Sequence, residues 1–430
     1  MAEFTVAVVG LGKIGLPLAA RFAQSGLRVT GCDINPDVVA EVNAGRSHVK
    51  QESGLEEAVA SAVSQGLLRA TTDTASAVRE SNVVVVIVPV VVDEERNVDY
   101  RGIDAATRAV AEGLQRGTLV LYETTLPVGT TRTRFGPALE GVSGLRAGED
   151  FCLAFSPERV YSGRIFRDLE QYPKVVGGTT PECTRRAAEF YRVALGGAPV
   201  MEMQDADTAE LVKLMETTYR DVNIALANEF ARFASARGLP VDQAIAAANS
   251  QPFSHIHRPG IAVGGHCIPV YPYFLINYAG ESEMNLPRLS RRINDDMAHW
   301  ALQRLSQELG GLEGKRVLVL GLSYRENVKE PIFSGGVRLI SLLREAGAVP
   351  LVNDPLFTDD EIAAYGAVPA SLVDLPAIDA AIVQAYHNRY RDVDWHALAR
   401  SGCSVVLDGR NSIDPMAVRA SNMTYLGMGR

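Results

Sequence analysis

The stretch Thr5-Val6-Ala7-Val8-Val9-Gly10-Leu11-Gly12-Lys13-Ile14-Gly15 decides the fold of this chain. A short apolar run, typical of a buried strand, leads directly into three closely spaced glycines, and an apolar helical pattern follows them. The glycines permit a tight turn, the close approach of a pyrophosphate to backbone N–H groups, and close packing of the helix that begins there. The stretch therefore predicts the first strand, turn and helix of a dinucleotide-binding Rossmann domain.

An acidic residue completes this predicted cofactor site. Asp33 lies 18 residues after Gly15, at the end of the next predicted strand. A carboxylate there binds both ribose hydroxyls and repels a 2′-phosphate, so the sequence favours NAD over NADP. Pro89 closes a further strand, where it either lies along the cofactor or only terminates the strand. The residues that we assign to the cofactor are Gly10, Gly12, Lys13, Ile14, Gly15, Asp33, Pro89, Thr125 and Glu158.

Apolar strand runs alternate with helical patterns through the first 200 residues, which is typical of a doubly wound parallel sheet. These runs are 5–9, 28–32, 83–88, 118–122 and 174–176. A second series follows a glycine-rich segment, with strands at 316–320, 349–353, 380–383 and 405–407 and a helix at 335–346. We therefore predict an α/β protein of two Rossmann-like doubly wound parallel-sheet domains, 1–200 and 311–430, joined by a helical region, 201–310.

One long central helix is predicted over 207–237, because apolar residues recur at helical spacing and neither proline nor glycine occurs before Gly238. The recurring residues are Leu211, Met215, Val222, Leu226, Phe230 and Phe233. We expect this face to pack mainly against the rest of the chain, although a long helix also offers the surface for a two-fold dimer. A second helix is predicted over 287–309.

Composition and charge argue against several classes of protein. The chain has 47% hydrophobic residues and a net charge of −9, and without a basic run it is not expected to bind nucleic acid. No apolar stretch reaches the roughly 18 residues of a membrane span, and no basic leader precedes the first strand, so we expect a cytoplasmic protein. The five scattered cysteines show no CxxC spacing, so neither a disulfide framework nor a metal site is expected.

Cys267 is the residue with the strongest chemical implication. It lies in Gly264-Gly265-His266-Cys267-Ile268-Pro269, a glycine-tight loop of a chain whose first residues bind a dinucleotide. A thiolate that traps an aldehyde as a thiohemiacetal allows a second hydride transfer, so an alcohol can be taken to an acid. The alternative is that Cys267 is a small buried hydrophobic residue, as free cysteines often are.

Several motifs follow one another along the chain: GLGKIGLP at 10–17, TTLPVGTT at 124–131, SPERVYSG at 156–163, Lys213 on the long helix, and HRPGIAVGGHCIP at 257–269, before the second predicted α/β domain. In this order they resemble the motifs of the UDP-glucose/GDP-mannose dehydrogenase family. The last motif and YRDVNIALANE at 219–229 resemble the branch that acts on UDP-N-acetylhexosamines. The resemblance implies a UDP-sugar substrate whose C6 hydroxyl is oxidised to a carboxylate, with two NAD per turnover and without release of the aldehyde. The product would serve a surface polysaccharide or a secondary metabolite.

The resemblance also implies a role for individual residues. Cys267 matches the nucleophile, and Lys213 matches the lysine that stabilises the oxyanion at C6. Glu158 matches the base that orders the hydrolytic water, and Thr125 the hydroxyl that bridges cofactor and water. The alternatives are a solvated lysine on a helix face, a turn carboxylate, and a threonine at an ordinary strand end.

The nucleotide and sugar are expected to meet arginines, because guanidinium groups suit diphosphate oxygens. Each of these arginines could instead be an ordinary surface charge. The three histidines of the loop have no metal-like spacing, and His266 is expected to be a structural neighbour of the cysteine. The residues that we assign to the substrate are Glu158, Arg159, Val160, Lys213, Thr217, His257, Arg258, Gly264, Arg325 and Arg410.

The chain departs from the family pattern at two catalytic positions. Tyr271 replaces an Asp four residues after the cysteine, and Thr217 replaces an Asn four residues after Lys213. Both replacements offer a hydroxyl in place of the carboxylate or amide, so we expect an altered oxyanion site that still involves Thr217 and Tyr271. Arg325 also stands where many relatives carry a lysine, and 329–334 differs from the usual acidic-then-Arg-Glu-Ser segment.

Three other functions remain open. A UDP-glucose 6-dehydrogenase differs only in the sugar, and the residues that sense C2 are not evident from the sequence. A two-electron hydroxyacid dehydrogenase shares the first domain and the long helix but needs neither Cys267 nor Glu158. A nucleotide-sugar binder without activity would result if the changes at Thr217 and Tyr271 had abolished the chemistry.

Overall fold

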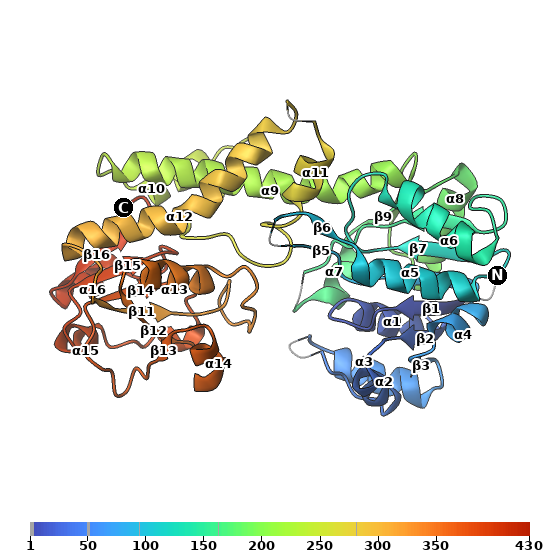
Figure 1. The fold of residues 1–430 in the computed structure, drawn as a ribbon, viewed down its shortest axis with the longest axis horizontal. Helices are drawn as coiled ribbons and strands as arrows, with labels where there is room; N and C mark the ends of the chain where they lie inside the picture. Colours follow the sequence, from blue (N-terminus) through green and yellow to red (C-terminus); the bar gives the residue numbers. More distant parts are fainter. Residues whose placement is uncertain (1–3, 50–51, 94, 162, 281) are drawn as a thin grey trace. The chain divides into compact units, whose positions relative to one another are not determined.

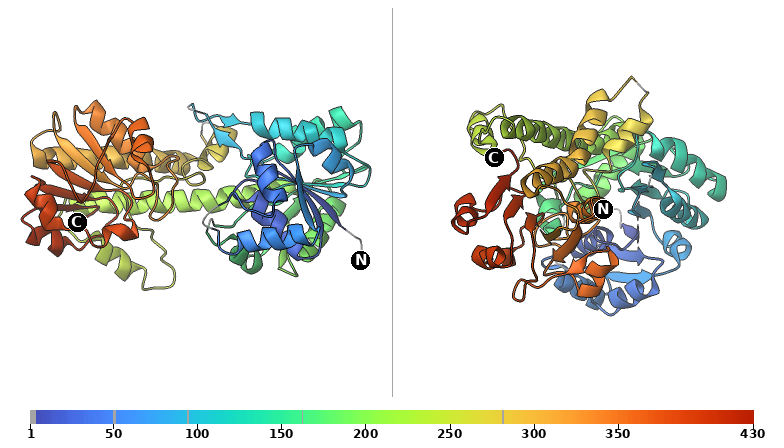
Figure 2. Two further views of the ribbon diagram at one scale, coloured as in Figure 1. Left: turned by 90° about the horizontal axis from the view of Figure 1, so that it is seen from below. Right: turned by 60° about the vertical axis from the view of Figure 1, so that its left-hand side comes forward.

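The computed structural model describes residues 4–49, 52–93, 95–161, 163–280 and 282–430, and it separates into two compact units. Unit 1 contains 1–216 and 273–278, and unit 2 contains 217–272 and 279–430. Helix α9 (Ala206–Ser235) is the long central helix; it begins in unit 1, ends in unit 2 and is continuous in Figure 2. Among the described residues, no helix is both long and apolar enough to cross a membrane.

Unit 1 is built on an eight-stranded sheet with the order β10-β9-β8-β7-β4-β1-β2-β3 (Figure 1). Its strands are β1 (Thr5–Val9), β2 (Arg28–Cys32), β3 (Leu68–Thr71), β4 (Val83–Val86), β7 (Leu119–Tyr122), β8 (Cys152–Phe155), β9 (Lys174–Gly178) and β10 (Val200–Glu202). The central strand β4 consists of four buried valines, as expected of a parallel strand covered on both faces. The sheet is parallel from β3 to β8, whereas β9 runs antiparallel to β8.

Helices cover both faces of this sheet, and several begin with a side-chain cap. The helices are α1 (Gly15–Gln24), α2 (Pro36–Asn43), α3 (Leu55–Ser64), α4 (Thr74–Arg79), α5 (Arg101–Gly113), α6 (Gly136–Ser143), α7 (Ile165–Gln171), α8 (Pro181–Ala194) and α11 (Pro272–Tyr278), with a π-helical turn at Thr131–Phe135. Asn35, Asp73 and Thr180 accept hydrogen bonds from first-turn N–H groups of α2, α4 and α8. A short hairpin, β5 (Val91–Val92) and β6 (Val98–Asp99), follows β4.

Unit 2 contains a six-stranded parallel sheet with the order β13-β12-β11-β14-β15-β16. Its strands are β11 (Arg316–Leu320), β12 (Val349–Asn353), β13 (Val368–Pro369), β14 (Ala380–Val383), β15 (Val405–Asp408) and β16 (Thr424–Gly427). Its helices, besides the second part of α9, are α10 (Val241–Ala248), α12 (Asn285–Leu309), α13 (Gly335–Glu345), α14 (Asp359–Ala364), α15 (Trp395–Arg400) and α16 (Pro415–Ala420), with a 3₁₀ turn at Asn388–Tyr390. Met297, Ala301 and Leu305 of α12 pack with Val317 and Val319 of β11 in one core.

The predicted fold class is confirmed, with differences in detail. Strands 5–9, 28–32, 316–320, 349–353 and 380–383 have the predicted bounds. The strand predicted at 83–88 ends at Val86, and the reversed direction of β9 was not predicted. Strands β3, β5, β6, β8, β10, β13 and β16 were missed, because each has at most four residues and carries little periodicity.

The expectation about the apolar face of α9 is wrong for four of its six residues, and the other two, Leu211 and Val222, are half-buried. Met215, Leu226, Phe230 and Phe233 are exposed, and Tyr219 beside them is 62% exposed. Small and aliphatic residues on the other side of the helix provide its packing instead. These buried residues are Leu214, Ile224, Ala225, Ala227, Ala231 and Ala234.

Candidate active site

The glycine turn between β1 and α1 has the geometry of a pyrophosphate site. Gly10 has φ +96°, in the region that favours glycine. A Cβ at Gly15 would lie 1.8 Å from the Gly10 carbonyl oxygen, so the close packing of α1 requires a glycine there. A Cβ at Gly12 would meet nothing within 4 Å, and Gly12 and Lys13 are exposed. The turn therefore presents an open surface in front of the helix N-terminus, which fits a dinucleotide.

Asp33 is held at the end of β2 by two backbone groups. Its Oδ2 accepts from the Leu11 N–H at 2.9 Å, and its Oδ1 accepts from the Asn35 N–H at 2.9 Å. Each oxygen retains acceptor capacity, so the oriented carboxylate can bind ribose hydroxyls. The next residue, Ile34, is 95% exposed and was not predicted as part of the site. Pro89 is also exposed, three residues beyond β4.

Thr125 follows β7 and is buried, in a loop that α9 anchors. The anchor is Glu210 of α9, which sequence reasoning missed. Its carboxylate accepts hydrogen bonds from the Gly129 N–H and, at Oε1, from the N–H and hydroxyl of Thr131 at 2.8 and 2.7 Å. The loop that carries Thr125 is thus fixed to the helix one turn before Lys213.

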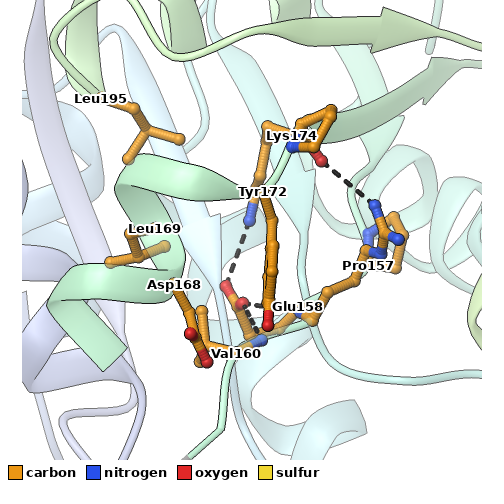
Figure 3. Close-up of a pocket in the computed structure, with 10 residues that line it drawn as sticks. Pro157, Glu158, Val160, Asp168, Leu169, Tyr172, Lys174 and Leu195 are labelled. Carbon is orange, nitrogen blue, oxygen red and sulfur yellow. Dashed lines mark hydrogen bonds and ion pairs between the residues drawn. The ribbon is translucent and has the colours of Figure 1, made fainter. Parts of the chain in front are cut away.

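Glu158 follows β8 and lies in the small pocket of Figure 3. Its Oε1 accepts from the N–H groups of Arg159 and Val160 at 2.7 and 3.0 Å. Its Oε2 lies 3.1 Å from Nζ of Lys174, a residue of β9 that was not predicted as part of the site. Burial opposes ionisation of Glu158. Three contacts nevertheless lower its pKa: the Lys174 ammonium, a hydrogen bond with the Glu123 side chain, and the Val160 N–H.

Arg159 joins this pocket to α9. Its Nη2 forms an ion pair with Glu216 Oε1 at 2.5 Å, and its Nη1 donates to the Pro173 carbonyl at 3.2 Å. Lys213 therefore lies on α9 between Glu210, which holds the Thr125 loop, and Glu216, which holds the Glu158 segment. The structure brings the predicted residues Thr125, Glu158 and Lys213 into unit 1 together with the cofactor turn.

Cys267 is exposed in unit 2, whereas the other four cysteines are buried. The alternative that it is a packing residue is therefore wrong for this chain. Its loop is narrow because a Cβ at Gly264 would lie 2.7 Å from the Phe333 carbonyl oxygen and 2.6 Å from the Tyr324 Cβ. Gly265 has φ +92° and donates its N–H to the Ile332 carbonyl at 3.1 Å.

Two neighbours of Cys267 have defined partners. His266 Nε2 lies 3.2 Å from Oε2 of the buried Glu330, in the segment that departs from the family pattern. The Cys267 carbonyl accepts from the N–H groups of Val270 and Tyr271 at 3.2 and 2.9 Å, which turns the chain towards α11. Tyr271 is half-buried, and Thr217, its counterpart on α9, is 6% exposed.

The arginines of the second α/β domain have structural partners. Arg410 donates to three carbonyls: Nε to Gln384 at 2.7 Å, Nη2 to Tyr324 at 2.9 Å and Nη1 to Ala262 at 3.4 Å. Burial lowers its pKa. Arg410 thus clamps the cysteine loop to the strand ends, and only its remaining N–H groups could reach a phosphate. Arg325 Nε donates to the Tyr324 hydroxyl at 2.9 Å.

The first part of the cysteine loop is held by two asparagines of α9 that sequence reasoning missed. Asn223 donates to the His255 carbonyl at 2.6 Å and accepts from the His257 N–H at 2.9 Å. Asn228 accepts from the Gly260 N–H at 2.9 Å. His257 is half-buried, and burial together with the positive charges of Arg220 and Arg258 lowers its pKa. The positive charges here are the guanidinium groups of Arg220 and Arg258, and they suit an anionic ligand.

The whole chain is similar in sequence to a family of nucleotide-sugar enzymes. Residues 4–195 match the NAD binding domain of the UDP-glucose/GDP-mannose dehydrogenase family, 207–296 its central domain and 318–415 its UDP binding domain. The UDP-N-acetyl-D-mannosamine dehydrogenase of Pyrococcus horikoshii is 36% identical over 430 residues, 99% of each chain. An NDP-N-acetyl-D-galactosaminuronic acid dehydrogenase of Ralstonia solanacearum is 35% identical and covers 94% of this chain and 95% of its own.

Solved structures agree with this relationship. The structure of the Pyrococcus horikoshii enzyme has a TM-score of 0.88 and covers 99% of each chain at 34% identity. A UDP-glucose dehydrogenase from Pyrobaculum islandicum has a TM-score of 0.86 and covers 100% of this chain and 98% of its own at 29% identity. Since three family domains match in order and relatives above 30% identity span nearly the full length, the chain belongs to the UDP-glucose/GDP-mannose dehydrogenase family and uses NAD as its cofactor.

Proposed function

We propose that the protein oxidises the C6 hydroxyl of a UDP-N-acetylhexosamine to a carboxylate with NAD. The observation that carries this proposal is the single exposed cysteine, Cys267, in a loop whose glycines admit no side chain. A two-electron dehydrogenase has no use for such a thiol, but a four-electron oxidation needs one to retain the aldehyde. The product would leave as a UDP-linked uronic acid, suited to polysaccharide synthesis in the cytoplasm.

The proposed reaction has two oxidations and one hydrolysis. In the first oxidation, C6 loses a hydride and the hydroxyl loses a proton. The Cys267 thiolate then adds to the aldehyde carbon, and loss of a second hydride turns the thiohemiacetal into a thioester. Water attacks the thioester carbon and the C–S bond breaks, which releases the acid and regenerates the thiolate. NAD supplies the hydride acceptor for each oxidation.

The roles of the other residues follow from the charge that develops at C6. Lys213 provides a cation for the alkoxide and the tetrahedral oxyanions. Glu158 accepts a proton from the attacking water, and Thr125 orients that water beside the cofactor. Tyr271 and Thr217 offer hydroxyl donors in place of the family's Asp and Asn, so we propose that hydrogen bonds from neutral groups support the oxyanion here.

The choice of sugar is proposed from the relatives. The Pyrococcus horikoshii and Ralstonia solanacearum enzymes are named for N-acetylated sugars, and each is at least 35% identical to this chain. The UDP-glucose dehydrogenase from Pyrobaculum islandicum is 29% identical. We therefore place an N-acetyl group at C2 of the substrate, with UDP bound by the second α/β domain.

We also propose that the protein works as a homodimer through α9. Five exposed apolar or aromatic residues of α9 recur at spacings of three, four and seven: Met215, Tyr219, Leu226, Phe230 and Phe233. At 3.6 residues per turn they lie within about 60° of one another and form one stripe. A continuous apolar stripe on a long helix is suited to the same stripe of a second copy.

The experiment that tests the function counts NADH released per sugar consumed, with UDP-N-acetylmannosamine, UDP-N-acetylglucosamine and UDP-glucose. We expect two NADH per sugar with an N-acetylated substrate. Cys267→Ser is expected to lose acid formation, whereas Cys403→Ser, a buried cysteine in the same unit, is the matched control. One NADH per sugar would indicate a two-electron dehydrogenase. NAD binding without any NADH would indicate a nucleotide-sugar binder.

A further inference from the structure

Lys174 is a buried ammonium group in the pocket beside Glu158. Its side chain is 6% exposed, and its Nζ lies 2.7 Å from Glu123 Oε2 and 3.1 Å from Glu158 Oε2. The lysine belongs to β9, whereas the two carboxylates follow β7 and β8; the three strands are consecutive in the sheet, in the order β9-β8-β7. One cation therefore serves two carboxylates at the same edge of the sheet.

Glu123 is more deeply buried than Glu158 and holds the ammonium from the other side. It is 0% exposed, and its Oε1 accepts from the Tyr191 hydroxyl of α8 at 2.5 Å. The Lys174 Nζ also lies 4.9 Å from the centre of the Tyr191 ring. Because these contacts fix the ammonium from two directions, Lys174 has little freedom to move away from Glu158.

We propose that Lys174 is a positioning residue: its ammonium group keeps the Glu158 carboxylate ionised and aimed, while Glu123 and Tyr191 keep the ammonium in place. The inference rests on the proposed role of Glu158 as the base of thioester hydrolysis. Only an ionised carboxylate can take the proton of the attacking water. Two backbone N–H groups bind Glu158 Oε1, Lys174 binds Oε2, and the Glu123 side chain also shares a hydrogen bond with this carboxylate, so the attacking water would bind at the acceptor capacity that remains.

The charges in the pocket support this division of roles. Burial opposes ionisation of both carboxylates; it raises the pKa of Glu123, whereas the ammonium and two hydrogen-bond donors lower the pKa of Glu158. Burial disfavours the ammonium too, but the two carboxylates raise the pKa of Lys174. The base is thus the carboxylate that stays charged.

The remaining charged groups that face the pocket are paired elsewhere. Arg159 binds Glu216, and Asp168 of α7 accepts from the Tyr161 N–H and from Arg164 Nε at 2.9 and 3.1 Å. Tyr172 is 37% exposed at the pocket rim. Among the described lining residues, Lys174 is therefore the cation that contacts Glu158 directly (Figure 3).

The test measures the pH dependence of thioester hydrolysis in single turnovers, with the acyl-enzyme followed by intact mass after quenching. The acid limb of the pH–rate profile is the fall in rate as Glu158 becomes protonated. In Lys174→Met we expect this limb to move to higher pH by at least one unit, because Glu158 loses its counter-charge. At pH values below the acid limb of wild type, hydrolysis should fall at least tenfold, the factor that corresponds to one pKa unit. Lys174→Arg keeps the charge and should keep the wild-type acid limb.

Lys315→Met is the matched control, because Lys315 forms a half-exposed ion pair with Asp379 in unit 2. A loss by one constant factor at every pH in Lys174→Met would overturn the proposal, since a merely structural role has that effect. If Lys174→Met does not fold, Glu123→Gln/Lys174→Met removes the cation without leaving two buried carboxylates, and the same rise of the acid limb is expected.

A measurement on the free enzyme separates this inference from the proposed function. Infrared difference spectra with Glu158→Gln as reference assign the Glu158 carboxylate band. We expect the band to titrate at higher pH in Lys174→Met than in wild type, whether or not any sugar is oxidised. An unchanged titration overturns the role of Lys174, whereas a shifted titration without acid formation overturns the proposed function alone.

Discussion

Asp33 and Asp354 occupy equivalent positions in the two α/β domains. Each follows the second strand of its sheet, and its Oδ2 accepts from the residue after the first glycine: the Leu11 N–H at 2.9 Å and the Leu322 N–H at 2.7 Å. The second aspartate differs in that His387 Nε2 lies 3.0 Å from the same oxygen. Since His387 Nδ1 accepts from the Asn327 N–H, Nε2 carries the proton and donates it. Asp354 thus has a structural role, whereas Asp33 retains acceptor capacity and can bind a ribose.

Asp33→Asn is expected to weaken NAD binding by about tenfold or more, since a charged hydrogen bond contributes about 1.5–3 kcal/mol. The amide retains one acceptor oxygen for Leu11 N–H, so the turn should persist. Isothermal titration with NAD and NADP measures the effect, and the preference for NAD over NADP should narrow. Asp354→Asn is the control at the equivalent position. If both variants bound NAD as wild type does, Asp33 would not contact the cofactor.

Asp354→Asn is expected to lower stability in a pH-dependent way. Burial opposes ionisation of Asp354, but His387 and the N–H groups of Leu356 and Leu322 lower its pKa. A carboxyl whose folded pKa lies below the unfolded one contributes stability above the unfolded pKa, about 3.9, and loses it as the pH falls through the folded pKa. The loss at pH 7 should be about 1–3 kcal/mol and should shrink in acid.

Calorimetric unfolding between pH 3 and 8 measures this difference. Asp360→Asn, an exposed carboxyl in the first turn of α14, serves as the control and should change stability little. A deficit of the same size at every pH would show that the ionised form of Asp354 is not what stabilises the domain.

Alanine substitutions at two glycines of the cofactor turn are expected to have different effects, one on stability and the other on NAD binding. Gly15→Ala places a Cβ 1.8 Å from the Gly10 carbonyl oxygen, so α1 must move and the melting temperature should fall. Gly12→Ala meets nothing within 4 Å, so the protein should fold normally but bind NAD at least several-fold more weakly, because the methyl group occupies the surface left for the pyrophosphate. Thermal melts and NAD titrations of both variants check this. Equal NAD affinity of Gly12→Ala and wild type would place the pyrophosphate elsewhere.

The contrast between local and long-range contacts explains what the sequence could predict. The strand, the glycine turn and Asp33 lie within 29 residues, so their spacing can be recognised in the sequence alone. The fold class and the cofactor were predicted from that spacing. Lys174, Glu123 and Glu158 meet only because β7, β8 and β9 are neighbours in the sheet, and no spacing encodes that order. The roles of the site residues themselves remain predictions for the experiments above.

Arg410 shows a second limit of sequence reasoning. A guanidinium group in a nucleotide-binding domain suggests a phosphate contact, and the sequence contains no sign of the three carbonyls that Arg410 binds. The apolar face of α9 is a third case, because helical periodicity indicates that a face is covered but not by what. Its exposed residues are the basis of the last prediction.

Phe230→Glu is expected to convert a dimer into a monomer. Phe230 is 41% exposed and lies in the α9 stripe, so a carboxylate there would face its own copy or apolar residues across a two-fold interface. The isolated chain should tolerate the change, because the side chain is already in contact with solvent. Phe253→Glu is the matched control, since Phe253 is 92% exposed and lies outside α9. Sedimentation velocity at micromolar concentration is expected to give a dimer for wild type and Phe253→Glu and a monomer for Phe230→Glu. A monomeric wild type, or a dimer that persists in Phe230→Glu, would mean that the stripe is not covered by a second copy of the chain.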